Sequence, residues 1–168
     1  QVYQELKYYL KAEEIYKKIQ PQHNLYIEAQ KFIVINKKDN SKFNEAENSL
    51  IKLVELFPDN ISLIVLLADL YRTNKQFDNA IELYSSIIKE KNINSDQLWR
   101  FYYLRGICYE RLNKWLKAEK DFLQSLKIEP EHPQVLNYLA YGWVERNIFI
   151  DRSLEMLTKA SQKDPDNY

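Results

Sequence analysis

The feature that most constrains this chain is an internal repeat with a step close to 34 residues. Ala12, Ala46 and Ala80 lie 34 residues apart, and Ala118 and Ser153 continue the series after 38 and 35 residues. A period between about 20 and 50 residues indicates an array of small units that bury their apolar faces only against their neighbours. We therefore expect one continuous repeat domain and no single central core.

Two further columns keep the same register. An aromatic residue precedes each small residue by three or four positions, and a bulky apolar residue follows it by four. The columns read Tyr9, Phe43, Phe77, Trp115 and Phe149, then Tyr16, Leu50, Tyr84, Phe122 and Leu157. Spacings of three and four are those of an amphipathic helix. Only two glycines occur, which disfavours the Gly-rich turns of β and doubly wound folds. An all-α fold is predicted.

Each repeat divides into two helical segments joined by a short polar break. The predicted pairs are 25–38 with 43–56, 61–74 with 77–90, 97–112 with 115–128, and 133–147 with 151–163, preceded by a half unit at 9–20. The longer 38-residue step places four extra residues within 91–96, with Ser95 or Asp96 as the N-cap of the next helix. The small residues are interpreted as the points where helices cross closely, including Ala68, Gly106 and Ala140 on the first helices.

These columns resemble the tetratricopeptide repeat. The clearest match is residues 99–132. Elsewhere the sequence departs from the pattern at Lys37, Asn24 and Asn92. The matching positions there are Leu104, Gly106, Tyr109, Trp115, Ala118, Phe122 and Pro130. The resemblance implies an all-α, right-handed superhelical α-solenoid of helix-turn-helix repeats. It divides the chain into a partial repeat at 1–24 and repeats at 27–60, 61–94, 99–132 and 133–167. The stretch Asn137–Trp143 resembles a variant common in bacterial members.

Neither end of the chain matches the end of a finished repeat array. The chain opens partway through a first helix, and Pro165–Tyr168 matches Pro58–Ile61, where a repeat begins. Leu154, Leu157 and Ala160 would then form an apolar face without a covering helix, whereas a solenoid normally ends in a polar cap. We expect the native protein to continue at both ends.

The sequence offers no catalytic, cofactor or metal site. His23 and His132 fall in inter-repeat loops, with no second His or Cys nearby, and we expect both to be solvent-exposed. Cys108, the one cysteine, lies on an apolar face, where a buried, inert thiol is expected. Glycine-based phosphate or nucleophile motifs are absent. Carboxylate pairs such as Glu13-Glu14 are interpreted as solvated charge, and no enzyme is predicted.

The composition restricts the classes of partner that we expect this chain to bind. Basic and acidic residues balance at 24 each, which disfavours the basic stripe of a nucleic-acid binder. The most apolar run, Ile61–Tyr71, is shorter than the ~20 residues of a membrane span. The compartment stays open: cytoplasmic, or bacterial periplasmic or membrane-associated.

The resemblance also implies where a partner binds, because first helices of this family line a concave groove that usually holds the ligand. The candidates are therefore residues of these first helices that lie at helical spacing beside the packing face. The candidate groove residues are Lys31, Ile35, Lys38, Val65, Asp69, Arg72, Arg100, Tyr103, Ile107, Asn137 and Tyr141, with Glu28, Ser62, Glu110, Gln134 and Val144 in the same stripe. Such a groove suits an extended peptide or an amphipathic helix, with Tyr103 and Tyr141 as central anchors.

One known use of the family is a clamp for the two carboxylates of a chaperone C-terminus. It needs Lys and Asn four apart on one first helix, and a basic pair four apart on a later one. Lys31 is followed at that distance by Ile35, and Arg100 by Leu104. No chaperone-tail clamp is predicted.

Three hypotheses on function follow. The leading one is a non-catalytic protein–protein interaction scaffold that binds a peptide or helix in its concave groove. The second is an accessory repeat region of a larger bacterial enzyme, such as a peptidase or glycosyltransferase. The third is a structural module that self-associates through the ends of the solenoid.

Overall fold

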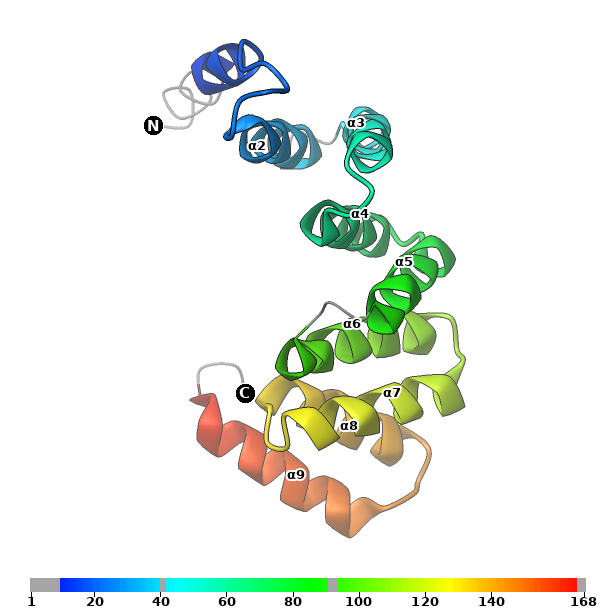
Figure 1. The fold of residues 1–168 in the computed structure, drawn as a ribbon. Helices are drawn as coiled ribbons and strands as arrows, with labels where there is room; N and C mark the ends of the chain where they lie inside the picture. The colour runs from blue at the N-terminus through cyan, green and yellow to red at the C-terminus, as the bar shows by residue number, and fades with distance from the viewer. Residues whose placement is uncertain (1–9, 40–41, 91–93, 166–168) are drawn as a thin grey trace. The chain divides into compact units, whose positions relative to one another are not determined.

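The computed structural model describes residues 10–39, 42–90 and 94–165, which form helices joined by short turns (Figure 1). Residues 10–16 form a first helical segment. The elements that follow are α2 (Tyr26–Asp39), α3 (Phe43–Leu56), α4 (Ile61–Thr73), α5 (Phe77–Lys89), the 3-10 turn η1 (Ser95–Gln97), α6 (Leu98–Arg111), α7 (Trp115–Ile128), α8 (Pro133–Glu145) and α9 (Ile150–Lys163). No strand occurs in these described ranges, and the predicted all-α helical repeat fold is confirmed.

The boundaries of the four predicted helix pairs agree with the structure to within two residues, and α3 and α7 coincide with the predicted 43–56 and 115–128. The half unit predicted at 9–20 differs, because its helix ends at residue 16. The capping prediction before α6 was wrong. The side chain of Asn94 accepts a hydrogen bond from the backbone N–H of Asp96 at 3.2 Å, so Asn94 caps η1. Gln97 then precedes α6 without a side-chain cap. Residues 91–93 of the predicted insertion lie outside the described residues.

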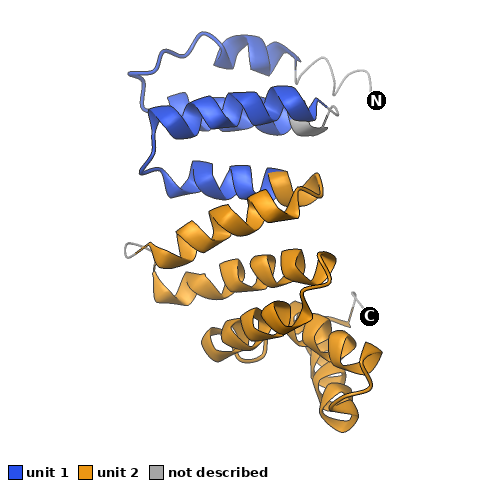
Figure 2. Ribbon diagram, turned by 90° about the vertical axis from the view of Figure 1, so that its right-hand side faces the viewer, with its two compact units in different colours: residues 1–70 blue, residues 71–168 orange. Residues whose placement is uncertain are grey.

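The chain divides into two compact units, residues 1–70 and 71–168 (Figure 2). In the first unit, Tyr16 packs edge-on against Phe32 of α2, with ring centroids 4.7 Å apart. The Glu13 carboxylate accepts a hydrogen bond from the side-chain amide of Asn36 at 2.7 Å. The apolar core of this unit consists of Ala29, Ile33, Val34, Ala46, Leu50, Leu53, Leu63, Leu67, Ala68 and Leu70. Burial of this apolar surface is what stabilises the packed helices.

In the second unit the small residues lie where the sequence placed close crossings. Ala80, Ala118 and Ser153 are fully buried. A Cβ atom added at Gly106 of α6 would lie 2.7 Å from Cε1 of Phe122 on α7, and one at Gly142 of α8 would overlap the ring of Trp115. The packing interpretation of these residues is confirmed. No side chain larger than hydrogen fits at either glycine without displacing an aromatic ring.

Three turns within this unit share one backbone geometry. Lys75, Asn113 and Asn147 have φ near +60°, the left-handed region. In each turn the following residue donates its backbone N–H to the carbonyl five positions earlier, at 2.8–3.0 Å. This bond satisfies a carbonyl at the end of a helix, and it requires a left-handed residue before the donor. Asparagine tolerates that conformation better than most residues, so the turns form without glycine.

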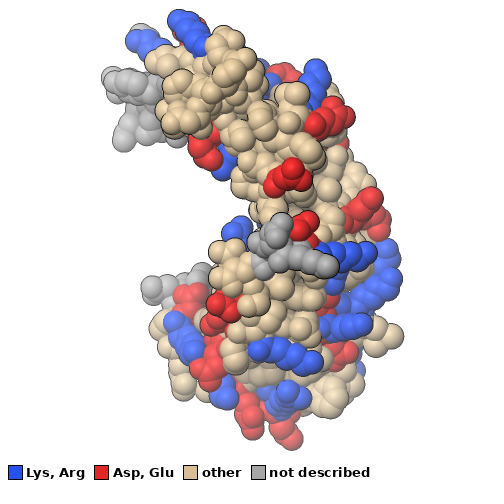
Figure 3. Space-filling view, viewed as in Figure 1, with Lys and Arg blue, Asp and Glu red and all other residues tan. Residues whose placement is uncertain are grey.

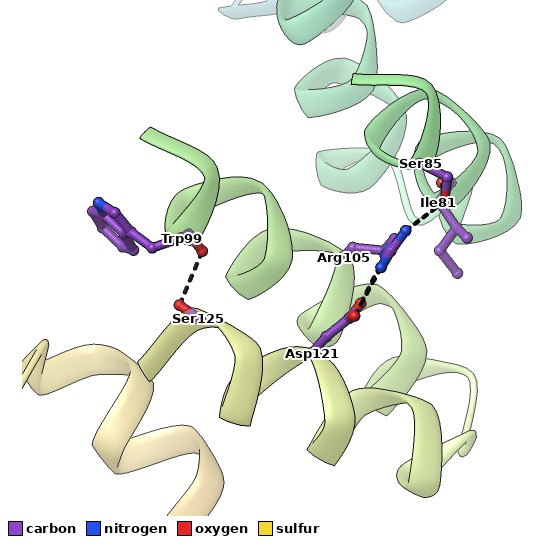
Figure 4. A network of polar contacts seen from close by, with 6 residues as sticks. All are labelled: Ile81, Ser85, Trp99, Arg105, Asp121 and Ser125. Carbon is purple, nitrogen blue, oxygen red and sulfur yellow. Dashed lines mark hydrogen bonds and ion pairs between the residues drawn. The ribbon is translucent and has the colours of Figure 1, made fainter. Parts of the chain in front are cut away.

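A buried ion pair joins α5, α6 and α7 (Figure 4). The guanidinium of Arg105 donates to both carboxylate oxygens of Asp121, at 2.7 and 2.8 Å, and to the hydroxyl of Ser85 at 2.9 Å. Asp121 is only 4% exposed. Burial acts to lower the pKa of Arg105, but its hydrogen bonds and charge attraction to Asp121 outweigh this and raise the pKa.

We predict that Asp121→Asn lowers the free energy of unfolding by about 3 kcal/mol, because the variant leaves the Arg105 cation largely buried without its counter-charge. Urea denaturation followed by circular dichroism measures this loss. The control is Asp78→Asn, which removes an exposed ion pair with Lys114 and should cost less than about 1 kcal/mol. Equal losses in the two variants would show that the buried pair adds no special stability.

His132, which precedes α8, is not the exposed loop residue that the sequence predicted. Its ring packs on Trp99 with centroids 4.1 Å apart, and its buried Nδ1 has no hydrogen-bond partner among the described residues. Burial lowers the pKa of His132, against an opposing attraction from Glu129. The unfolded chain binds the proton more tightly than the folded one. The stability that His132 contributes is therefore full above its ordinary pKa of 6.5 and is lost as the pH falls below it.

We predict that the melting temperature falls as the pH is lowered from about 7.5 to about 5.5, and that His132→Phe reduces this fall. Phenylalanine keeps a ring against Trp99 but carries no titrating group. Thermal melts of the two proteins across this pH range make the measurement. His23→Phe changes an exposed histidine and serves as the control. A fall of the same size in the parent protein and in His132→Phe would assign the pH dependence to other groups.

Candidate partner-binding surface

The described residues contain no cluster typical of a metal site. No group of three or more His, Cys, Asp or Glu side chains among them is close enough to hold a metal ion. Cys108 is fully buried, as predicted. His23 is exposed, also as predicted, and its Nδ1 accepts a hydrogen bond from the backbone N–H of Leu25 at 3.1 Å.

On the face drawn in Figure 3, basic and acidic side chains both occur on each unit. Of the helices that the structure describes, none is long and apolar enough to cross a membrane. The candidate binding residues are therefore the stripe residues that the sequence assigned to a groove.

In the first unit the stripe is partly exposed. Ile35 of α2 is 43% exposed, and the ammonium of Lys31 forms an ion pair with Glu28 at 2.9 Å. Val65 and Asp69 of α4 are half-buried. The side chain of Lys38 lies outside the described residues. The apolar surface offered here is thus limited to Ile35 and the edge of Val65.

In the second unit the structure corrects the expectation at Tyr103 and Ile107, which are each only 8% exposed. The ring of Tyr103 packs against Tyr138 of α8 and Phe122 of α7, with centroids 5.6 and 6.3 Å apart. Tyr103 is therefore a core residue, and the predicted anchor position on α6 is not open to a partner. Arg100 is exposed, and Arg72 donates from Nε to the hydroxyl of Tyr84 at 3.3 Å.

The structure does bring together the stripe residues at the end of α6 and along α8. Glu110, Asn137 and Tyr141 line a hollow of about 320 Å³, which we call the α6–α8 hollow. The rest of its lining consists of Arg111, Tyr138, Gly142 and Glu145. Tyr141 is 54% exposed, a large exposed fraction for an aromatic side chain. The second predicted anchor is thus accessible, unlike the first.

Two acceptor atoms of this hollow are unsatisfied. Oε2 of Glu110 and Oδ1 of Asn137 are both buried, and neither accepts a hydrogen bond from the described residues. Oε2 of Glu110 lies 3.5 Å from Nε of Arg111, an ion-pair distance. Buried acceptors without donors are costly and are rare in folded proteins. The hollow is therefore chemically suited to a group that donates hydrogen bonds, above all a cationic one.

Sequence reasoning missed Arg111 and Glu145 as parts of this site. Both lie just outside the helical stripe chosen from the repeat register, beside Glu110 and one turn after Tyr141. The signal that was available is their position in the last turn of a first helix, where α6 and α8 both end. The sequence alone does not reveal that these two ends lie at the same hollow.

The comparisons with known proteins agree with the helix pairs. A sequence model of the tetratricopeptide repeat matches residues 99–132, and a second model with the same description matches residues 61–93. These segments coincide with α6 and α7 and with α4 and α5.

Solved structures of MamA have a similar fold. One described as "Crystal structure of MamA" is 19% identical and has a TM-score of 0.75, with 95% of this chain and 90% of that chain covered. A double mutant of MamA from RS-1 is 17% identical, with a TM-score of 0.77 and coverage of 95% and 88%. MamA 41-end from Desulfovibrio magneticus RS-1 is 17% identical, with a TM-score of 0.67 and coverage of 80% and 73%. At these identities the likeness concerns the fold, and the two sequence models identify residues 61–93 and 99–132 as tetratricopeptide repeats.

Proposed function

We propose that this chain is a non-catalytic interaction scaffold that binds a segment of a partner protein on its first helices, with the α6–α8 hollow as the main recognition site. The observation that carries the proposal is the hollow itself, where an exposed tyrosine lies beside two unsatisfied acceptors. Tetratricopeptide repeats serve as protein-interaction modules, and the described residues contain no group of His, Cys, Asp or Glu side chains that could hold a metal ion.

The hollow favours a particular kind of partner segment. Oε2 of Glu110 and Oδ1 of Asn137 would each accept a hydrogen bond, which a lysine, an arginine or a backbone N–H supplies. An ionised donor gives the stronger bond to a carboxylate. The half-exposed ring of Tyr141 presents a face on which an apolar or guanidinium group packs. The expected segment carries a basic residue next to an apolar one.

The role of the first unit in binding is secondary in this proposal. Ile35 and Val65 provide modest apolar surface on α2 and α4, and Lys31 and Asp69 lie in the same stripe. These residues would give a separate, weaker contact surface within the first unit, where such contacts add specificity more than affinity.

We predict that peptides selected for binding from a random display library share a basic residue beside an apolar one, and that Tyr141→Ala weakens them by roughly tenfold or more. Asn137→Leu should weaken them as well, since it replaces a required acceptor with an apolar group. Fluorescence anisotropy with the purified variants gives the affinities. Tyr103 is unsuitable for this test because its substitution would disturb the core.

The matched control is Leu116→Ala, which removes an apolar side chain that is 80% exposed on α7 and is no part of the hollow. It should leave binding within about twofold. Circular dichroism verifies that each variant is folded. Peptides that bind the folded Tyr141→Ala and Asn137→Leu proteins as tightly as the parent would exclude the hollow as the recognition site.

A further inference from the structure

A second, larger concavity lies on the other side of α8, between α7 and α9. It has a volume of about 620 Å³, within the range of roughly 300–1,000 Å³ typical of ligand pockets. We call it the α7–α9 groove. Leu136 and Leu139 line it from α8. At 100° per residue these two leucines lie about half a turn round α8 from Asn137 and Tyr141, so the groove and the α6–α8 hollow use opposite faces of one helix.

The inner surface of the groove is apolar. Leu136, Leu139 and Met156 are buried at its floor, and Leu123 and Leu126 of α7 are half-buried along one wall. A row of apolar side chains between two helices is the kind of surface on which the apolar face of a third helix packs. Leu136, Leu139 and Met156 are at most 8% exposed, so the apolar surface open to a partner comes mainly from Leu123 and Leu126.

Charged side chains round the rim are mainly basic. Four cations line the groove, Lys120, Lys127, Arg152 and Lys159, against two acids, Glu131 and Glu155. The carboxylate of Glu131 is already paired with Lys163 at 2.6 Å. Neither Lys120 nor Lys127 forms an ion pair within the described part of the chain, and both are exposed. The guanidinium of Arg152 lies over the ring of Trp143, 5.2 Å from its centroid, which holds it in place.

From this combination of an apolar floor and a basic rim, we propose that the α7–α9 groove binds an acidic amphipathic helix of a partner protein. Leucine-like residues of that helix would pack on Leu123 and Leu126 above the buried floor, while its carboxylates face Lys120 and Lys127. The rim charges steer and orient the partner, and the apolar contacts supply most of the affinity. The chain would thus hold two different segments at once, a basic one in the hollow and an acidic one in the groove.

A designed peptide tests this assignment. The probe is a fluorescent amphipathic peptide of about 15 residues, with leucines on one face and glutamates on the other, beside a counterpart with lysines for glutamates. The acidic peptide is expected to bind at least about tenfold more tightly than the basic one. Lys120→Glu/Lys127→Glu should weaken the acidic peptide by about tenfold and strengthen the basic one. Equal binding of both peptides, or no binding of the acidic one, overturns the proposal.

The matched control is Lys52→Glu/Lys89→Glu. It makes the same change of net charge at two exposed lysines outside the groove, one within a helix and one in a last helical turn, as Lys120 and Lys127 are. Binding of the acidic peptide should stay within about twofold of the parent. A loss equal to that of the groove variant would show that overall charge, and not the groove, attracts the peptide.

The groove also contains a built-in reporter. Met156 is the only methionine of the sequence, so a protein labelled with ¹³C at the methionine methyl group gives one resonance from the groove floor. The acidic peptide is expected to shift this resonance and to do so equally in Tyr141→Ala, which separates this inference from the proposed function. An unchanged resonance at saturating peptide, or a shift produced by raising the concentration of the protein alone, overturns the assignment to a partner helix.

Discussion

The arrangement of the second unit depends on the close approach of two aromatic rings to two helix-interior glycines. Phe122 of α7 lies against Gly106 of α6, and Trp115 of α7 lies against Gly142 of α8. The first contact sets the distance within one helix pair, and the second sets the distance to the next pair. Because α7 uses both, a single helix fixes the spacing of its neighbours on either side. Side chains in such dense packing have little room to shift, so a methyl group at either glycine would have to displace the aromatic ring against it.

This spacing creates the two surfaces that we propose for partner binding. With α8 held against Trp115, one of its faces meets the end of α6 at the α6–α8 hollow, and the opposite face forms the floor of the α7–α9 groove. The two surfaces differ in chemistry. The hollow presents unsatisfied acceptors beside a tyrosine, while the groove presents leucines within a basic rim. One helix can therefore separate two partner segments of opposite charge, and neither competes with the other for the same side chains.

The helices and their small crossing residues could be predicted from sequence because both follow from a local period. The aromatic columns and the spacings of three and four specify α3 and α7 to the residue. The candidate site was harder to predict from the sequence, because the exposure of a side chain depends on the helix pair that packs beside it. Tyr103 lies at the border between the stripe and the packing face, and Tyr138 and Phe122 draw its ring into the core. The sequence assigned no role to Asp121, yet Arg105 of α6 donates to its carboxylate and also to Ser85 of α5. A local sequence pattern does not show that side chains from three different helices come into contact.

The shared geometry of the turns at Lys75, Asn113 and Asn147 has a consequence for how a chain of this kind changes length. Each turn ends its helix with the same backbone bond and the same left-handed residue. A segment copied from one of these residues to the next therefore enters and leaves with matching backbone conformations. Gene duplication or deletion in steps of one such segment would create no new kind of junction, and the loops between pairs, such as that at η1, can absorb extra residues. Because of these turns, the repeat is a unit that can be duplicated or deleted whole, as well as a unit of packing.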